Sequence, residues 1–454
     1  MEREFEFYGD SDINDLIIRF EDLIQNGNGI YFDVEEFEDI IDYYDEIHDG
    51  KYMDRALDTA LEIHPAHSYF KLKRAQRYSM AEKFNKSLKL LKEIIQIEPR
   101  NYGAFESLAY VYGQLGNHKK AIEIYLECIN LGSEEDETWL NIALEYQNLG
   151  KYEMSLAYFK KILKNYPENE EALYEILFCY ESLNLQEESV EFFLDYINSE
   201  PYSVPAWFNL GVSYSNLELY EKAIEAYDFV IAIVGGYTSA YFNKANAYMS
   251  LEKYVEAIKC YKESFEFEAE DSITCLYIAQ CYDQLDDFEN SLFYYFKSIE
   301  LDEYQSEAWA GIGLIYHQLN NHYKAIGFFE EAINIDRLNT EYIISLAAVM
   351  IDLEKFNEAE KLINNALEID EDDPDIWYFL IDVYILMEEK EKSENVLSLA
   401  LSKFPENKRL LFKQADILNQ NHKEKESLRY LQMIGIETIE QMNMLLDNPD
   451  LIDF

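Results

Sequence analysis

The stretch WFNLGVSYSNLELYEKAIEAYDFVI, residues 207–231, recurs along the chain with the same order of large and small side chains. It aligns without gaps with WLNIALEYQNLGKYEMSLAYFKKIL (139–163) and with WAGIGLIYHQLNNHYKAIGFFEEAI (309–333). The offsets of 68 and 102 residues are both multiples of 34. Units that start every 34 residues, from residue 68 to residue 408, run without an insertion, and a fixed period of this kind is typical of repeat architectures.

Three positions within the 34-residue unit are nearly constant. Position 8 is Ala or Gly in nine of eleven units, position 11 is Tyr in nine, and position 20 is Ala or Ser in all. At about 100° per residue, positions 4, 7, 8, 11 and 14 form the buried arc of a first helix, near positions 2–14. Positions 17, 20, 24 and 27 form the buried face of a second helix, near positions 18–31. Small side chains at positions 8 and 20 allow Tyr or Phe at positions 11 and 24 to lie against the facing backbone. The pattern therefore predicts an all-α solenoid of antiparallel helix pairs.

One unit carries nearly the whole pattern of a known repeat. It follows W-x-x-L-G-x-x-Y, then a small residue and an aromatic one, at Trp207, Leu210, Gly211, Tyr214, Ala223 and Tyr227. This pattern resembles the tetratricopeptide repeat, and the resemblance extends over about residues 34–434. It implies a right-handed superhelical solenoid in which the exposed side of the first helices lines a concave, peptide-binding groove.

The two ends of the chain differ from the regular units. We expect residues 1–33 to contain a capping helix at 11–25, and residues 435–454 to contain a closing helix at 437–447 followed by an acidic tail. The first unit of the array reads as irregular, with one extra residue in its first half and a shortened second helix. The last unit is also irregular, since Asn421 stands where Leu is usual. Terminal units of a solenoid face water, which accounts for such irregularity.

The chain is strongly acidic, with 89 acidic and 38 basic residues and a formal net charge of −51. Nucleic acids and anionic membranes bind basic surfaces, so we expect neither as a partner. The negative field instead favours a protein or peptide partner that is basic or neutral. The sequence has no apolar run of membrane-spanning length and begins without a recognisable secretion signal. Its five cysteines form no C-x-x-C pair, so we expect reduced thiols and a cytoplasmic location.

Motifs of catalysis and cofactor binding are missing from the sequence. It contains no Gly-rich phosphate loop, G-x-S-x-G elbow, H-E-x-x-H or EF-hand spacing. The pairs His64/His67 and His317/His322 lack the i, i+4 spacing of helical metal ligands. The cysteines fall on or beside the packed arcs, where a small buried side chain is their expected role. We therefore expect no catalytic residue, no cofactor and no metal ion, and hence no enzyme.

Positions 2, 5, 6, 9, 12 and 13 share the other side of the first helix, which we call the first-helix face. Across the units from residue 136 to residue 339 this face contains six acidic residues and no Lys or Arg. Side-chain amides can pair with any peptide backbone, and aromatic rings supply contact area at low entropic cost. The amide and aromatic residues expected to bind a partner are Asn141, Gln147, Tyr174, Phe178, Phe208, Asn209, Phe242, Asn243, Asn246, Tyr277 and Gln280.

These observations favour a scaffold or adaptor that holds an extended polypeptide segment in an acidic groove rich in Asn, Tyr and Phe. Asn141, Asn209 and Asn243, all at position 6, resemble part of the asparagine ladder of some long peptide-binding arrays. A chaperone that keeps an aggregation-prone client extended is the main alternative, and an enzyme or regulatory subunit with a site on the groove is a remote one. A basic clamp for chaperone C-termini is not supported, because it needs several Lys and Arg residues on this face.

Overall fold

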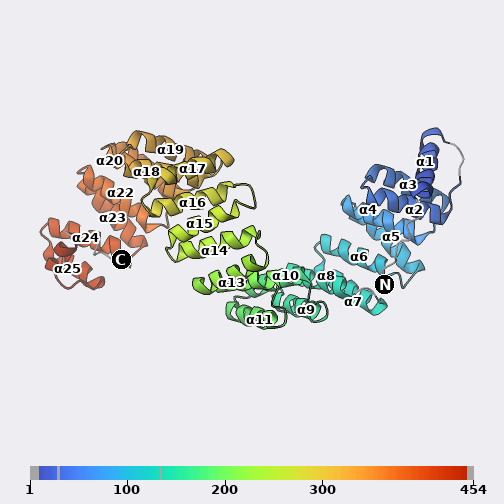
Figure 1. Cartoon of the computed structure of the whole chain (residues 1–454). Helices are drawn as coiled ribbons and strands as arrows, with labels where there is room; N and C mark the ends of the chain where they lie inside the picture. The colour runs from blue at the N-terminus through green and yellow to red at the C-terminus, as the bar shows by residue number, and fades with distance from the viewer. Residues whose placement is uncertain (1–9, 28–30, 133–134, 447–454) are drawn as a thin grey trace. The chain divides into compact units, whose positions relative to one another are not determined.

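The computed structural model describes residues 10–27, 31–132 and 135–446, and every regular element within these ranges is a helix. Figure 1 shows the helices in chain order. They are α1 (Asp10–Asn26), α2 (Val34–Glu46), α3 (Gly50–Ile63), α4 (Ser68–Met80), α5 (Phe84–Ile97), α6 (Tyr102–Gln114), α7 (His118–Leu131), α8 (Glu135–Asn148), α9 (Tyr152–Asn165), α10 (Glu170–Ser182), α11 (Gln186–Ser199), α12 (Val204–Asn216), α13 (Tyr220–Ile233), α14 (Thr238–Ser250), α15 (Tyr254–Ser264), α16 (Ser272–Gln284), α17 (Phe288–Leu301), α18 (Ser306–Gln318), α19 (His322–Ile335), α20 (Thr340–Asp352), α21 (Phe356–Ile369), α22 (Pro374–Leu386), α23 (Lys390–Lys403), α24 (Lys408–Gln420), α25 (Glu424–Met433) and α26 (Ile439–Leu446).

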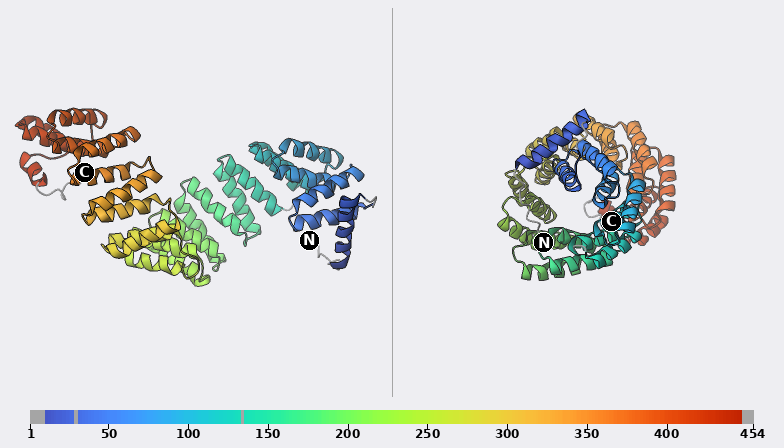
Figure 2. Two further views of the ribbon diagram at one scale, coloured as in Figure 1. Left: turned by 90° about the horizontal axis from the view of Figure 1, so that it is seen from above. Right: turned by 90° about the vertical axis from the view of Figure 1, so that its right-hand side faces the viewer.

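The chain forms two compact blocks, an N-terminal block of residues 1–226 and a C-terminal block of residues 227–454. Within each block, successive helices pair and stack in the order of the sequence, as Figures 1 and 2 show. The first helix of a regular unit occupies positions 1–13 and the second positions 17–30, one residue earlier than the sequence predicts. The expectation of an all-α repeat solenoid is confirmed.

Polar residues at the last position of a unit determine where the next first helix begins. The side-chain oxygen of Asn169 accepts a hydrogen bond from the backbone N–H of Ala172 at 2.8 Å, and that of Asp271 accepts one from Thr274 at 2.8 Å. Such N-caps satisfy backbone donors that have no partner inside the helix. The next unit therefore starts in the same register each time.

The turn between the two helices of a unit is also repeated. In all twelve units from residue 34 onward, position 15 adopts a left-handed backbone conformation, for example at His48 and Asn320, both with φ of 56°. The N–H of the following residue donates to the carbonyl at position 11, as from Asn321 to Tyr316 at 2.8 Å. This is the hydrogen-bond pattern of a Schellman motif, which offsets the roughly 1 kcal/mol cost of a left-handed non-glycine residue.

Close approach of the paired helices depends on the small residues at positions 8 and 20, as the sequence predicts. The position-20 hydroxyl of Ser291 donates to the position-8 carbonyl of Ala279 at 2.8 Å, and Ser427 bonds to Ala415 in the same way at 2.7 Å. At position 8 of another unit, a Cβ on Gly313 would lie 3.0 Å from the ring of Phe329. A larger residue at these positions would push the two helices apart.

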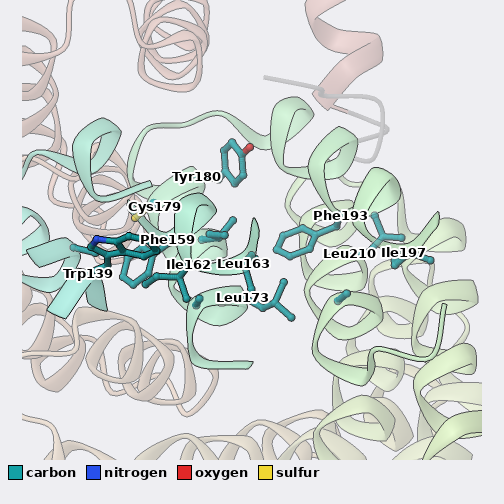
Figure 3. Close-up of a cluster of buried hydrophobic side chains, with 14 of the residues drawn as sticks. Trp139, Phe159, Ile162, Leu163, Leu173, Cys179, Tyr180, Phe193, Ile197 and Leu210 are labelled. Atoms are coloured by element: carbon teal, nitrogen blue, oxygen red, sulfur yellow. The ribbon is translucent and has the colours of Figure 1, made fainter. Parts of the chain in front are cut away.

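The position-24 side chains form the centre of the core. Phe159 and Phe193 are fully buried among side chains that include Trp139, Leu173 and Leu210 (Figure 3). This cluster joins second helices to the first helices of their own and neighbouring units within the N-terminal block. Burial of such aromatic rings supplies much of the hydrophobic stabilisation of each unit.

Most position-11 tyrosines are less buried than the sequence predicts, although Tyr180 and Tyr384 are buried, and where position 23 is aromatic the tyrosine ring packs against it. Tyr282 stacks on Tyr294 with ring centroids 5.8 Å apart, and Tyr316 stacks on Phe328 at 5.5 Å. The Lys262 ammonium lies 5.1 Å from the Tyr282 ring and 5.0 Å from the Tyr294 ring. These tyrosines therefore form a half-buried layer in which aromatic stacking and cation–π contacts replace deep burial.

The ends of the array agree only in part with the expected irregularity. The first unit has a regular backbone, because α2 and α3 occupy the same positions as the helices of later units and are equally long. The expected extra residue and shortened second helix are therefore wrong: the side-chain pattern deviates there, but the turn at His48 keeps the register. In the last unit the second helix, α25, is only 10 residues long, as expected of an irregular end.

Helices flank the array at both ends. α1 covers the first unit through Phe20, which is fully buried. Its ring centroid lies 6.1 Å from that of Phe32 and 6.4 Å from that of Phe37. At the other end α26 buries Met442 against the last unit, in a cluster with Phe412 and Leu431. The structure thus has a helix at each end where the sequence analysis expects a capping helix, while the expected acidic tail after residue 447 lies outside the described residues.

Candidate functional site

The first-helix face is partly exposed along most of its length in the described residues. In the N-terminal block, Tyr174 and Phe178 are exposed by 37% and 48% of their surface, which is high for large apolar side chains. Phe178 contacts the ring of Tyr152 edge-on, with centroids 5.9 Å apart. These two rings, one turn apart on α10, give the block an aromatic surface that a partner can cover.

Gln147 is held in place by the next unit. Its Nε2 donates to Oε2 of Glu175 at 2.7 Å and approaches the Sγ of Cys179 at 3.5 Å. Both partners lie on α10, so the amide is partly committed to contacts between repeats. Its carbonyl oxygen remains an acceptor for a partner.

Asn209 does not belong to the exposed face, which corrects the sequence-based prediction. Its side chain is fully buried, and Nδ2 donates to the backbone carbonyl of Leu173 in the preceding unit at 3.0 Å. Its Oδ1 is buried without a hydrogen-bond partner among the described residues. Asn209 therefore connects neighbouring repeats and cannot bind a peptide without rearrangement.

The reason is that position 6 faces position 24 of the preceding unit. A Cβ on Gly311 would lie 2.4 Å from the ring of Tyr295, so any larger residue there would force this buried ring to move. In another unit Tyr277 uses position 6 to stack on Tyr261, with centroids 6.0 Å apart and planes inclined by 9°. Position 6 is thus shared between the first-helix face and the contact between repeats, and the expected asparagine ladder is interrupted for a packing reason.

In the C-terminal block three rings form a compact aromatic cluster beside the first-helix face. Phe242 lies 5.6 Å from Tyr261 and 5.7 Å from Tyr277, both in edge-to-face geometry. The Tyr261 hydroxyl donates to Oδ1 of Asn246 and approaches Sδ of Met249 at 3.2 Å. Asn246 is therefore oriented by the cluster, and the residue is partly exposed.

Three amides of the face have no hydrogen bond to any described residue. They belong to Asn141 in the N-terminal block and to Asn243 and Gln280 in the C-terminal block, and all three are partly exposed. Phe208, also half-buried, lies on the same face of α12. The amides can form hydrogen bonds to the backbone of an extended segment, and the rings can pack against its side chains.

Asp283 gives the C-terminal part of the face a negative charge that is poorly compensated. Its Oδ1 is buried without a hydrogen-bond partner in the described ranges. Burial, and to a lesser degree the nearby Asp286, raises the pKa of Asp283 above its ordinary value. A carboxylate in this situation is stabilised by an added donor or cation. A basic side chain of a partner would supply one.

Sequence models of one repeat family match the chain along most of its array. The matches fall at residues 102–131, 136–169, 204–232, 238–270, 274–305, 306–337 and 350–417, more than half of the chain, and each model describes the tetratricopeptide repeat. The chain is a tetratricopeptide repeat protein. Proteins of this family act as scaffolds that bind peptides or other proteins. Among curated proteins, none matches the sequence.

Solved structures similar to this tetratricopeptide repeat protein cover either part or most of it. The structure of YrrB, described as a TPR protein with an unusual peptide-binding site, is 19% identical, covers 40% of this chain and 94% of its own, and has a TM-score of 0.34. MamA is 20% identical, covers 36% of this chain and 95% of its own, and has a TM-score of 0.34. The APC/C hetero-tetramer Cut9–Hcn1 is 12% identical over 92% of this chain and 99% of that chain, with a TM-score of 0.41.

The five cysteines of the repeat protein are free and buried, as expected for small core side chains. Burial raises the pKa of Cys128 and of Cys281 to about 12, and that of Cys260 to about 11. Neutral buried thiols are poor nucleophiles and poor metal ligands. None of the helices in the described ranges has the length and apolar character needed to cross a membrane.

The histidine pairs have different surroundings. The His64 ring packs against the core rings of Phe37 and Phe70, with centroids 6.2 Å apart in both pairs. His317 and His322 instead come together with Asp352 from the next unit. Spacing within one helix does not indicate this cluster, because its three residues come from α18, α19 and α20. Asp352 is at position 13 of the unit that follows the one containing both histidines. A search that included the ends of the first helices of neighbouring units would have found it.

Proposed function

We propose that this tetratricopeptide repeat protein is an adaptor that binds an extended, basic or neutral polypeptide segment along its first-helix face. The observation that carries the proposal is a pair of partly exposed amides, at Asn243 and Gln280, that form no hydrogen bond to a described residue. They lie beside the aromatic cluster of Phe242, Tyr261 and Tyr277. An amide offers one acceptor and two donors, so it can pair with a peptide backbone of any sequence. The binding role requires no catalytic group and no cofactor.

The charge of the face supports a basic or neutral segment. Asp283 keeps an uncompensated buried oxygen, and none of the face positions between residues 136 and 339 is Lys or Arg. A Lys or Arg of the partner would pair with this carboxylate and restore its pKa towards the ordinary value. An acidic segment would meet the negative field and bind weakly.

The proposal is tested with a selected peptide, since any partner segment must present a backbone and side chains to this face. A random peptide library displayed on phage is selected against the full chain, and the tightest peptide is measured by calorimetry. Replacing both Asn243 and Gln280 with Ala removes several backbone hydrogen bonds of about 0.5–1.5 kcal/mol each, so we expect binding to weaken roughly ten-fold or more.

A matched control removes two amides from a different surface of the same block. Asn357 and Asn365 are exposed on the second helix α21, and their double replacement by Ala should leave binding unchanged. If the control weakens binding and the face variant does not, the peptide binds elsewhere and the proposed face is wrong. Selection of many unrelated apolar peptides of equal affinity would instead favour the chaperone.

A further inference from the structure

Three side chains of metal-binding type from two successive repeat units meet in the C-terminal block. His317 lies near the end of α18, His322 is the first residue of α19, and Asp352 is the last residue of α20. One nitrogen of each imidazole and one carboxylate oxygen all lie within 4.8 Å of one another. Nε2 of His317 is 2.7 Å from Oδ2 of Asp352.

The repeat fold itself brings these residues together. The chain reverses between the two histidines through the left-handed residue Asn320, so residues five apart in sequence face each other across the turn. Their ring centroids are 5.6 Å apart and the planes are inclined by 61°. Stacking of the next unit then places the end of α20 beside the end of α18, which adds the carboxylate.

The spacing is close to that of a tetrahedral metal site. With bonds of about 2.0–2.1 Å, ligand atoms on one zinc ion lie about 3.4 Å apart, and two coordinating imidazoles have centroids roughly 5 Å apart. Binding would require His317 and Asp352 to separate by roughly 0.7 Å. The Asp352 side chain is 51% exposed, so this adjustment is open to it.

The cluster also has unused coordinating capacity. Nδ1 of His322 is buried and has no hydrogen-bond partner among the described residues. A buried imidazole nitrogen without a hydrogen-bond partner is disfavoured, and coordination of a metal ion would satisfy it. The net charge of the chain, −51, further favours a cation over an anion at this place.

We propose that His317, His322 and Asp352 bind one divalent transition-metal ion of the zinc type, with water as the fourth ligand. Two imidazoles and a carboxylate suit such an ion, and the remaining position accepts water or a group from a partner. The ion links the repeat units 306–339 and 340–373 and stabilises their stacking. His317 and Asp352, at positions 12 and 13 of their units, belong to the edge of the first-helix face, but none of the three residues is among the amides and rings proposed to bind a peptide.

The chain contains its own control for this proposal. His118 Nδ1 lies 2.7 Å from Oε2 of Glu145, which is the same kind of imidazole–carboxylate pair across two units. No second histidine or cysteine of the described residues joins this pair to form a three-ligand group. A site that needs three ligands is therefore expected at His317 and not at His118.

Calorimetry of the full chain with zinc chloride tests the site, in buffer with millimolar magnesium to occupy unspecific carboxylates. We expect one equivalent of zinc bound and a thermal midpoint that rises with zinc. His317→Ala, His322→Ala and Asp352→Asn should each weaken binding at least about ten-fold and abolish the rise, whereas His118→Ala should behave like the parent.

Two further readouts, the helical dichroism and the metal-free thermal midpoint, show whether each variant is folded. All the ligands are partly or largely exposed, so each variant should keep the helical dichroism and metal-free midpoint of the parent. If one variant fails to fold, the other two still test the site. A parent that binds no zinc, or cluster variants that bind it as the parent does, would overturn the proposal, as would loss of binding in the His118 variant.

Discussion

Two aromatic positions of the repeat unit differ in how deeply their rings are buried. Phe329, at position 24, is fully buried, and its ring packs directly against Gly313. Tyr316, at position 11 of the same unit, is half-buried and lies between Phe328 and the Lys324 ammonium, which is 4.5 Å from its ring. The first ring fills the core, while the second covers its edge.

The two positions should therefore differ in their effect on stability. Phe329→Ala leaves a core cavity and should lower the free energy of unfolding by about 3–5 kcal/mol. Tyr316→Ala loses a stacked pair and a cation–π contact, and should cost about 1–2 kcal/mol. Urea unfolding followed by circular dichroism measures both. Equal losses, or a larger loss for Tyr316, would contradict the assignment of position 24 to the centre of the core.

The buried thiols predict both chemical inertness and a pH dependence. With the pKa of Cys128 and Cys281 at about 12 and of Cys275 at about 11, these thiols stay protonated in the folded protein at pH 8. We expect a thiol reagent to label none of the five cysteines in the native protein and all five in urea.

The sign of the pH effect follows from the same pKa values. Above about pH 8.5 an unfolded cysteine loses its proton and the native one keeps it, so the unfolded state binds fewer protons and stability falls as pH rises. The loss continues until the native pKa of about 11 for Cys275 is passed. Rapid labelling of a cysteine in the native protein, or stability that rises between pH 8.5 and 10, would be inconsistent with buried neutral thiols.

At the scale of helices and repeats, the contact between neighbouring units is made partly by polar groups. Asn209 and Asn243 occupy the same position of successive units, but only Asn209 is buried and bonded to a carbonyl of the preceding unit. Asn243 is partly exposed and has no hydrogen bond to a described residue. One repeat position therefore serves packing in one unit and leaves an amide available in the next.

This difference gives a matched pair of substitutions. Asn209→Ala loses a buried hydrogen bond and should lower stability by about 1 kcal/mol or more, while Asn243→Ala should change it by less than about 0.5 kcal/mol. Their effects on binding of the selected peptide should be reversed, since only Asn243 is accessible. Thermal melting and calorimetry on the two variants separate these effects. Equal stabilities would show that the bond from Asn209 to Leu173 contributes nothing measurable.

For the molecule as a whole, the negative charge is the basis of the partner preference that we propose. The chain carries a formal charge of −51. Two features of the described residues are suited to cations. One is the cluster of His317, His322 and Asp352, and the other is the Asp283 oxygen that has no hydrogen-bond partner there. Such a field acts over roughly 10 Å at 0.1 M salt and is screened at higher salt.

Association of a basic peptide should therefore slow as salt rises. We expect the association rate of a Lys-containing selected peptide to fall about ten-fold or more between low and high salt, because steering by charge is lost. A neutral analogue of the peptide should show little change, and stopped-flow fluorescence measures both. If the association rate of the basic peptide does not change with salt, the negative field does not contribute to binding.

The repeat period, the helical composition and the small residues that allow close helix packing could all be predicted from the sequence. These features depend on spacings along one or two helices, where 3.6 residues per turn converts sequence directly into faces. The same spacing places the amides and rings on one side of the first helices, but it does not show that Asn209 among them is buried. Position 24 and the buried cysteines were placed correctly on this basis as well.

Which residues of these faces are covered depends on how the repeat units stack on one another. The burial of Asn209, the close approach of the Tyr295 ring to Gly311 and the meeting of His317, His322 and Asp352 all arise between units, through contacts that join residues about one period apart. The regular backbone of the first unit likewise depends on a turn at His48 that its side-chain pattern does not indicate. Stacking of one helix pair on the next fixes these contacts, and periodicity within a single unit carries no information about them.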